Sequence, residues 1–269
     1  SVHFEPIRVA NAFAHIEQRW PDLTVDRPAD EATLIGLPFP YVVPSNDPES
    51  GFAFDEMYYW DSFFIVQGLL ATDQNELAEG MLENILYLSK RFSMVPNGSR
   101  YYFTSRSQPP FMTTLIFEIF QRFDKDLNWL RERITVAEKE YHQVWMGSVQ
   151  PNWRQVYKGL SRYYDMNVLD DLAEAESGWD MTTRFDRRCL AYIPIDLNCL
   201  LYKYETDFVR AYELFEDPEA VMIWKGRAKK RAATIRKELW NEDRGFFFDL
   251  DYIHGKQSYV WSLAGFYPL

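Results

Sequence analysis

Apolar residues recur at helical spacing along most of this 269-residue chain. In its long amphipathic segments, positions i, i+3, i+4 and i+7 are apolar and the others are mostly polar, which is typical of helices with one buried face. The pattern predicts about eight helices, over residues 6–20, 61–71, 76–92, 111–123, 127–147, 194–207, 217–240 and 257–267. Short polar connections at 72–75 and around Asp124 predict that the second to fifth helices form two hairpins.

Four long stretches between the predicted helices have no helical pattern: 21–60, 93–110, 148–193 and 241–256. Loops of this length within a compact domain are usually functional. They contain most of the unusual residue combinations, which are FDEMYYWD at 54–61, PNGSRYYFTSRSQPP at 96–110 and ESGWDMTTRF at 176–185. We therefore expect an all-α fold of paired helices whose loops build a binding groove at one end.

The composition narrows the classes of partner. The net charge of −11 argues against nucleic acid, because binding to a phosphate backbone needs a basic surface. No run of about 18 apolar residues predicts a membrane-spanning helix, and the first residues lack the pattern of a signal peptide. Aromatic residues make up 17% of the chain, and they either fill a helical core or cover the apolar faces of sugar rings. The compartment stays open.

Two further features have plain interpretations. The 2 cysteines and 4 histidines form no CxxC or HxxxH pattern, so we expect no metal site. Apolar residues at helical spacing interrupt a basic run near the C-terminus, which favours a solvated helix face. The run comprises Lys225, Arg227, Lys229, Lys230, Arg231, Arg236 and Lys237.

Taken singly, the loop motifs leave alternatives open. Asp61 stands at a loop-to-helix junction, where it caps the helix or binds a ligand. The segment 96–110 is either a β-hairpin with a structural corner or a binding loop. Asp180 follows Gly178 and Trp179, and it is either a catalytic carboxylate or part of a turn.

Taken in order, the motifs resemble those of the trehalases, glycoside hydrolase family 37 within the (α/α)6-toroid clan. The resemblance runs from about residue 10 to the end. It rests on PYVVP (40–44), F-x-E-x-YYWDS (54–62), PNG-x-R-x-YY-x-x-SRSQPP (96–110), KEY-x-x-x-WM (139–146), LSRYYD (160–165), ESGWD (176–180), IPIDLN (193–198), LW-x-E-x-x-GFF-x-D-x-D (239–251) and SLAGFYPL (262–269).

The resemblance implies an (α/α)6 toroid with long loops and short β-hairpins at the active-site end. A complete ring of six helical hairpins needs about twelve helices, so we expect residues 1–269 to form a single toroid domain whose C-terminal portion is missing. The implied reaction is inverting hydrolysis of trehalose to two glucose molecules, without a cofactor. The implied partners are a small sugar and the missing C-terminal part, with no nucleic acid and no membrane.

The resemblance also implies roles for individual residues. The general acid of the family falls on Asp180, which needs an apolar setting to stay protonated, and Trp179 is expected to contribute to that setting. The sugar-binding residues fall on Phe54, Tyr58, Trp60, Asp61, Asn97, Arg106 and Gln108, and Trp179 is also expected to contact the substrate.

Three departures from the family pattern leave the substrate and the mechanism open. Ala53 stands where trehalases have a sugar-binding Arg, and the span 166–175 lacks their RPES segment. Toroid hydrolases of other α-glucosides or of glycosylglycerates are therefore alternatives. The catalytic base, a Glu, is expected downstream of residue 269, since the family uses the positions of Asp61, Glu176 and Asp196 for binding or scaffolding. Glu242, Asp249 and Asp251 suit a loop or a chance cation site. A non-catalytic carbohydrate-binding homologue and a helical interaction scaffold are the remaining alternatives.

Overall fold

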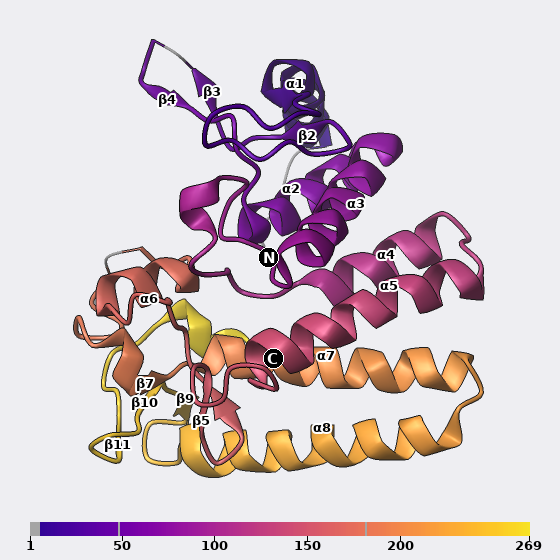
Figure 1. Cartoon of the computed structure of the whole chain (residues 1–269). Coiled ribbons are helices and arrows are strands. Elements are labelled where there is room, and N and C mark those ends of the chain that lie inside the picture. Colours follow the sequence, from indigo (N-terminus) through magenta and orange to yellow (C-terminus); the bar gives the residue numbers. More distant parts are fainter. Residues whose placement is uncertain (1–5, 48, 181) are drawn as a thin grey trace.

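The structure is a computed structural model that describes residues 6–47, 49–180 and 182–269. Helices dominate it, and the strands are short (Figure 1). The α-helices of the described residues are α1 (Pro6–Leu23), α2 (Tyr59–Ala71), α3 (Asn75–Phe92), α4 (Met112–Arg122), α5 (Leu127–Glu140), α6 (Asp170–Ser177), α7 (Ile195–Leu214) and α8 (Pro218–Leu239).

Three helical hairpins form the body of the molecule. They are α2–α3, α4–α5 and α7–α8, and Figure 1 shows them following one another from top to bottom. A continuous hydrophobic core runs through α2 to α5 and α7, with Leu69, Leu82, Ile116, Leu130 and Leu201 among its fully buried members. Caps mark some of the helix starts: the carboxylates of Asp126 and Asp217 accept backbone N–H groups of α5 and α8.

Short strands decorate the loops. They are β1 (Thr24–Val25), β2 (Tyr41–Val42), β3 (Asn46–Asp47), β4 (Phe52–Ala53), β5 (Gln155–Tyr157), β6 (Leu160–Ser161), β7 (Tyr192–Ile193), β8 (Trp240–Asn241), β9 (Phe246–Phe247), β10 (Leu250–Asp251) and β11 (Lys256–Gln257). The pairs β1–β2, β3–β4, β5–β6 and β8–β9 are antiparallel. In the sheet β11–β10–β7, Leu250 pairs with both Gln257 and Ile193.

The predicted helix over 257–267 is wrong. This segment forms β11, an extended stretch and a 3-10 turn at Leu263–Phe266. The rings of Trp261 and Phe266 pack on Phe246 at centroid distances of 5.0 and 5.1 Å. Contacts with the β8–β9 hairpin therefore override the weak helical pattern of the segment.

Two further elements differ from the prediction, and the sequence leaves a third segment, 96–110, open between a hairpin and a binding loop. Helix α6 falls in a stretch predicted to be irregular, because its sequence DDLAEAES has only three apolar positions. The predicted helix over 127–147 is α-helical only to Glu140 and continues as a π-helical turn at Tyr141–Trp145.

Residues 96–110 do not form a hairpin and contain a 3-10 turn at Tyr101–Phe103. The N–H of Ser99 donates to the carbonyl of Met57, and its carbonyl accepts the N–H of Ile35. Ser99 therefore bonds to other segments and not to an opposite arm of the same loop.

The basic run on α8 is only partly a solvated face. Most of its side chains are exposed, but Arg231 is buried against α7, where it pairs with Glu205. Arg231 was predicted to lie at the surface, but it is buried because Glu205 provides a counter-charge there.

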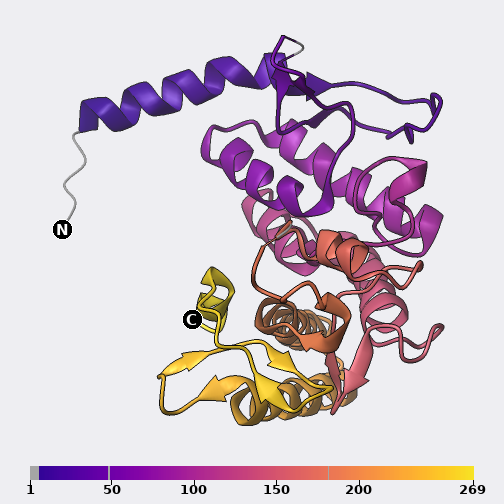
Figure 2. The same ribbon diagram turned by 90° about the vertical axis from the view of Figure 1, so that its left-hand side faces the viewer.

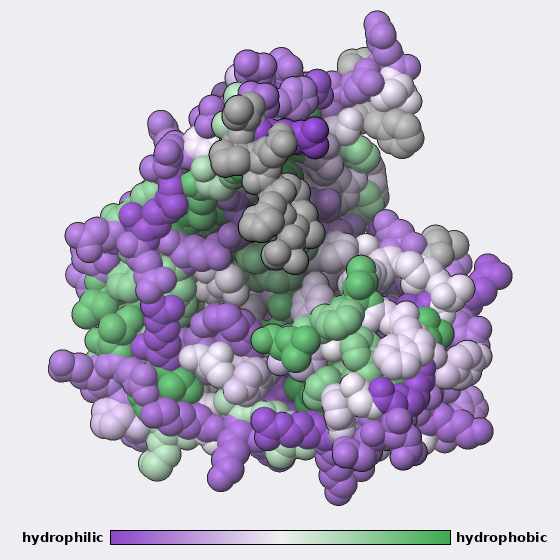
Figure 3. All heavy atoms as spheres, turned by 180° about the vertical axis from the view of Figure 1, so that it is seen from behind, coloured by the Kyte–Doolittle hydropathy of each residue, from purple (hydrophilic) through white to green (hydrophobic). Residues whose placement is uncertain are grey.

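The two ends of the chain extend to one side of the molecule. Helix α1 projects from the hairpins in Figure 2, and its residues 8–19 are exposed. The C-terminal segment extends to the same side, and Figure 3 shows patches of apolar atoms on that face. None of the described helices has the length and hydrophobicity that a bilayer span requires.

Candidate active site

One cavity of about 390 Å³ brings the loop motifs together. It lies where the start of α2, the 96–110 loop and the end of α6 meet. Its lining includes Asp180 and seven of the eight residues expected to bind sugar, Phe54, Tyr58, Trp60, Asp61, Asn97, Arg106 and Gln108. Trp179 is not among the lining residues. The sequence reasoning missed Pro44, Phe103, Ala175 and Gly178, which complete the wall.

Gly178 explains how Asp180 reaches the cavity. It ends α6 in the left-handed conformation, with φ +73°, which is costly for residues with a side chain. A Cβ at this position would overlap the indole of Trp60. The glycine thus turns the chain and lets a lining aromatic ring approach the backbone just before Asp180.

Trp179 supports the site from behind. Its indole N–H donates to Asp196 Oδ2 at 2.9 Å, and its ring packs on that of Trp60 with centroids 5.8 Å apart. Trp179 is therefore fixed at both ends, through α7 and through α2. Trp179, which was expected to provide an apolar setting for Asp180, thus holds Trp60 of the cavity wall in place.

Arg184 anchors the loop that follows Asp180. Its buried guanidinium makes two bonds to Asp196, at 2.7 and 3.1 Å, and two to Asp249, at 2.8 and 2.9 Å. Burial raises the pKa of Asp196, but the Arg184 charge and hydrogen bonds outweigh it and hold that pKa below its usual range. The loop is thus tied to the start of α7 and to the segment before β10. Sequence reasoning assigned Arg184 no role, although it lies only four residues after Asp180.

Burial raises the pKa of both carboxyl groups that line the cavity. Burial raises the pKa of Asp180, and the Arg106 charge opposes the shift. Burial also raises the pKa of Asp61, and the nearby charge of Asp180 adds to it. Asp61 lies in the first turn of α2, and the side chain of Tyr58 at the N-cap makes no capping bond. A carboxyl group with a raised pKa can donate a proton at a pH where an ordinary one cannot.

The amides of the opposite wall are held by the backbone. Gln108 Oε1 accepts the N–H of Trp60 at 2.8 Å. Asn97 Nδ2 donates to the carbonyls of Ser107 and Ala175, at 2.8 and 3.3 Å. These bonds fix both side chains, so that the Gln108 amide hydrogens and the Asn97 carbonyl oxygen are the groups left for a ligand.

One buried donor of a lining residue, Arg106 Nε, has no partner among the described residues, whereas the indole N–H of Trp60 interacts with the hydroxyl of Tyr267. Arg106 is otherwise held by Asp165, 3.3 Å from its Nη1, and by the ring of Phe103. Buried donors without partners are costly and rare. The presence of one at this cavity fits a ligand rich in hydroxyl groups.

The other carboxylates near the site are fully engaged. Glu176 is buried and accepts the guanidinium of Arg154 and the N–H groups of Ser107 and Tyr164. Asp249 bonds to Arg184, and Asp251 bonds to Arg188. Within the described part of the chain, no three His, Cys, Asp or Glu residues are arranged to hold a metal ion.

The departure at Ala53 is also visible. This residue lies on β4, where its backbone pairs with β3, and its side chain is exposed outside the cavity lining. Position 53 therefore contributes no guanidinium to the cavity.

Comparison with known proteins identifies relatives along the whole chain. A family model described as trehalase matches residues 5–174 and 151–269. The cytosolic neutral trehalase of Beauveria bassiana is 31% identical over 86% of this chain and 40% of its own length. The cytosolic neutral trehalase of Neurospora crassa is 32% identical, over 91% of this chain and 41% of its own. The chain thus spans about two fifths of these relatives.

Solved structures agree with the fold. The neutral trehalase of Saccharomyces cerevisiae matches with a TM-score of 0.76 and 27% identity, over 85% of this chain and 51% of its own. A mannosylglycerate hydrolase of Thermus thermophilus, in complex with glucose, matches with a TM-score of 0.64 and 18% identity, over 96% of this chain and 70% of its own. The predicted all-α fold, an incomplete (α/α)6 toroid with short hairpins, is confirmed.

Proposed function

This chain belongs to the trehalase family, and from that premise we propose that it forms the acid side of the active site of an inverting glycoside hydrolase. The proposed reaction is cleavage of trehalose to two glucose molecules. One observation carries the proposal: Asp180 shares a single cavity with seven residues of the two sugar-binding motifs.

Asp180 acts as the general acid. Its proton passes to the glycosidic oxygen as the bond between that oxygen and the anomeric carbon breaks. Burial supports this role, because it raises the pKa of the carboxyl group. Arg106 Nε, which has no partner among the described residues, donates to a sugar oxygen, and Phe54 and Tyr58 cover an apolar ring face.

We propose that the base comes from a segment beyond Leu269. An inverting mechanism needs a second carboxylate roughly 6.5–9.5 Å from the acid, on the far side of the attacking water. Asp61 is the only other carboxylate among the described lining residues, and it falls on a position that the family uses for sugar binding. Glu176 and Asp196 are saturated by arginines and backbone groups.

Replacing Asp180 tests the acid. In the protein that includes the C-terminal part, Asp180→Asn should lower kcat on trehalose by at least about a hundredfold, because general acid catalysis contributes that much or more. Its thermal midpoint should stay unchanged. The control is Asp243→Asn, an exposed aspartate outside the cavity, which should keep full activity. Turnover near the wild-type rate in Asp180→Asn would show that the acid is another residue.

Ala53 favours a second candidate substrate. Without the arginine that trehalases have here, a buried sugar hydroxyl loses a partner worth about 1–3 kcal/mol. Hydrolysis of another α-glucoside or of a glycosylglycerate is therefore the alternative activity. Rates on trehalose, glucosylglycerate, mannosylglycerate, kojibiose and nigerose decide between them, and exclusive cleavage of trehalose excludes the alternative. Sugar binding without hydrolysis of any of the five would instead indicate a non-catalytic carbohydrate-binding protein.

A further inference from the structure

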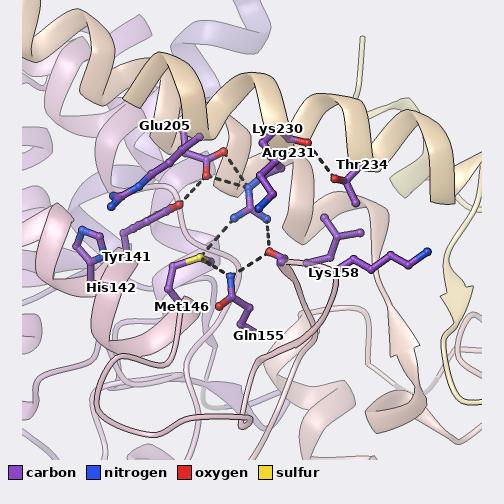
Figure 4. Close-up of a pocket in the computed structure, with 12 residues that line it drawn as sticks. Tyr141, His142, Met146, Gln155, Lys158, Glu205, Lys230, Arg231 and Thr234 are labelled. Atoms are coloured by element: carbon purple, nitrogen blue, oxygen red, sulfur yellow. Dashed lines mark hydrogen bonds and ion pairs between the residues drawn. The ribbon is translucent and has the colours of Figure 1, made fainter. Parts of the chain in front are cut away.

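A second cavity, of about 270 Å³, lies between α7, α8, the π-helical turn and the β5–β6 hairpin (Figure 4). It shares no lining residue with the candidate active site. Tyr141 and His142 reach it from the π-helical turn, and α8 provides Arg231 at its centre. A π-helical turn is rare, and such turns are found frequently at functional sites.

The charge of this cavity is opposite to that of the whole chain. Its described lining has four basic side chains and one acidic one, although the net charge of the chain is −11. The acidic residue, Glu205, is fully used: Arg231 Nε lies 2.8 and 3.0 Å from its two oxygens, and Tyr141 donates to it at 2.6 Å. A buried ion pair therefore closes the floor and leaves no free negative charge there.

The arginine of this pair is held rigidly. Arg231 Nη1 donates to Asn198 Oδ1 at 3.3 Å and to the carbonyl of Gly159 at 3.4 Å, and Nη2 contacts the sulfur of Met146 at 3.4 Å. Its side chain is only 5% exposed. The floor thus keeps its shape with or without a ligand.

Two cations at the rim are not neutralised. Arg227 and Lys230 make no ion pair with any carboxylate in the described part of the chain, and Arg227 stacks on Trp224 at 4.5 Å. The charge of Arg227 also acts on Glu138, which is not among the lining residues. Lys158, the remaining basic residue, is paired with Glu238 at 2.6 Å. The cavity therefore presents two positive charges without an ion pair, together with the fixed guanidinium of Arg231.

Neutral polar groups complete the wall. The Thr234 hydroxyl already donates to the carbonyl of Lys230, and the Gln155 amide nitrogen donates to Gly159 and to the sulfur of Met146. His142, on the π-helical turn, is therefore the neutral side-chain donor left among the described lining residues. Burial and the charge of Arg227 lower its pKa. Two cations and an imidazole suit an anion with several oxygens.

We propose that this cavity is a binding site for a small anion that carries a phosphate group. Arg227 and Lys230 attract the anion, and the imidazole N–H of His142 bonds to another of its oxygens. Partial enclosure strengthens the attraction relative to open surface, because fewer water molecules screen the charges. The source of the phosphate group is either inorganic phosphate or a phosphorylated sugar.

Calorimetric titration of the 269-residue chain at about 0.15 M ionic strength tests the site. The two probes are inorganic phosphate and a hexose phosphate. The double variant Arg227→Gln/Lys230→Gln should bind either probe at least about tenfold more weakly. The matched control, Lys229→Gln/Lys237→Gln, removes the same charge from exposed positions of α8 outside the cavity and should bind like the wild type.

Each outcome decides the proposal. Equal affinity for the two probes supports recognition of the phosphate group alone, and tighter binding of the hexose phosphate supports additional contacts to the sugar. The proposal fails if the wild type binds neither probe, or if both double variants lose affinity equally, since that would reflect the general charge of α8. The result is independent of hydrolytic activity, which needs Asp180 and the other cavity.

Discussion

At the scale of single residues, Gly178 determines the geometry at Asp180. Its left-handed backbone ends α6, and its lack of a side chain admits the indole of Trp60. Both requirements exclude other residues, the first by steric strain and the second by volume. The order Gly-Trp-Asp therefore has one physical reason for each member: a turn, an anchor to Asp196 and a carboxyl group in the cavity.

Replacing Gly178 by alanine should destabilise the folded protein. We expect Gly178→Ala to lower the free energy of unfolding by at least about 2 kcal/mol, from left-handed strain and overpacking together. Urea denaturation measures the loss. Gly226→Ala on α8 is the matched control, because a Cβ there meets nothing and the backbone is helical. The control should gain roughly 0.5–1 kcal/mol. Equal effects of the two changes would contradict this role of Gly178.

At the scale of elements, buried charges join parts of the chain that are distant in sequence. Arg184 connects the loop after α6 to α7 and to the segment before β10. Glu140, at the end of α5, accepts the hydroxyls of Tyr59 on α2 and Tyr204 on α7. Removing one partner from such a group leaves an uncompensated buried charge or polar atom.

The cost of breaking the Arg184 pairs should be large. Arg184→Met leaves two buried carboxylates without a counter-charge, and we expect a loss of about 3–5 kcal/mol in the free energy of unfolding. Arg188→Met removes a nearby pair whose arginine side chain is 39% exposed, and it should cost under about 1 kcal/mol. Denaturant titration of the two variants compares them. A small loss in Arg184→Met would mean that Asp196 and Asp249 find other partners.

Glu140 should make stability depend on pH. Burial raises its pKa to about 7, so the folded protein keeps a proton that the unfolded chain releases near its ordinary pKa of 4.5. The stabilisation is complete below that value and is lost as pH rises through about 7. Glu140→Gln should abolish this fall, whereas Glu132→Gln, on the exposed side of α5, should keep it. Thermal midpoints between pH 4.5 and 8 test this, and parallel profiles for the wild type and Glu140→Gln would refute it.

At the scale of the whole molecule, the toroid is open on one side. Helix α1 exposes Val9, Phe13 and Ile16, which share one face of the helix by their spacing. Trp261, Leu263 and Leu269 are exposed in the C-terminal segment, and the two regions extend to the same side (Figure 2). Since the chain spans about two fifths of its relatives, we propose that the remaining helical hairpins of the toroid cover these surfaces.

The open toroid should bind sugar without hydrolysing it. We expect the 269-residue chain to bind trehalose or glucose through the cavity at Asp180 and to release no glucose from trehalose. The longer protein with the C-terminal part should release it. A glucose assay and calorimetry on both proteins provide the measurement. Hydrolysis by the 269-residue chain that Asp180→Asn abolishes would place the base within this chain, with Asp61 as the first candidate.

The helical pattern and the motif order were readable from the sequence. Seven of the predicted helices exist. A helix with one buried face needs apolar residues at helical spacing, and this pattern can be recognised in the sequence. The prediction failed for α6 and for 257–267, where the apolar pattern is weak and packing decides the conformation. The family assignment also came from the sequence, because several motifs in a fixed order are specific although each one is not.

Only the tertiary structure decided how the motifs act together. Residues 54–61, 97–108 and 175–180 are far apart in sequence, and the folded chain alone brings them to one cavity. The unpartnered donor of Arg106, the burial of Arg231 and the anchoring by Arg184 depend in the same way on contacts between distant elements. The sequence by itself determined the helices and the family, since those are local patterns. Burial, charge pairing and cavities are properties of neighbours in space, and they appear only once the chain is folded.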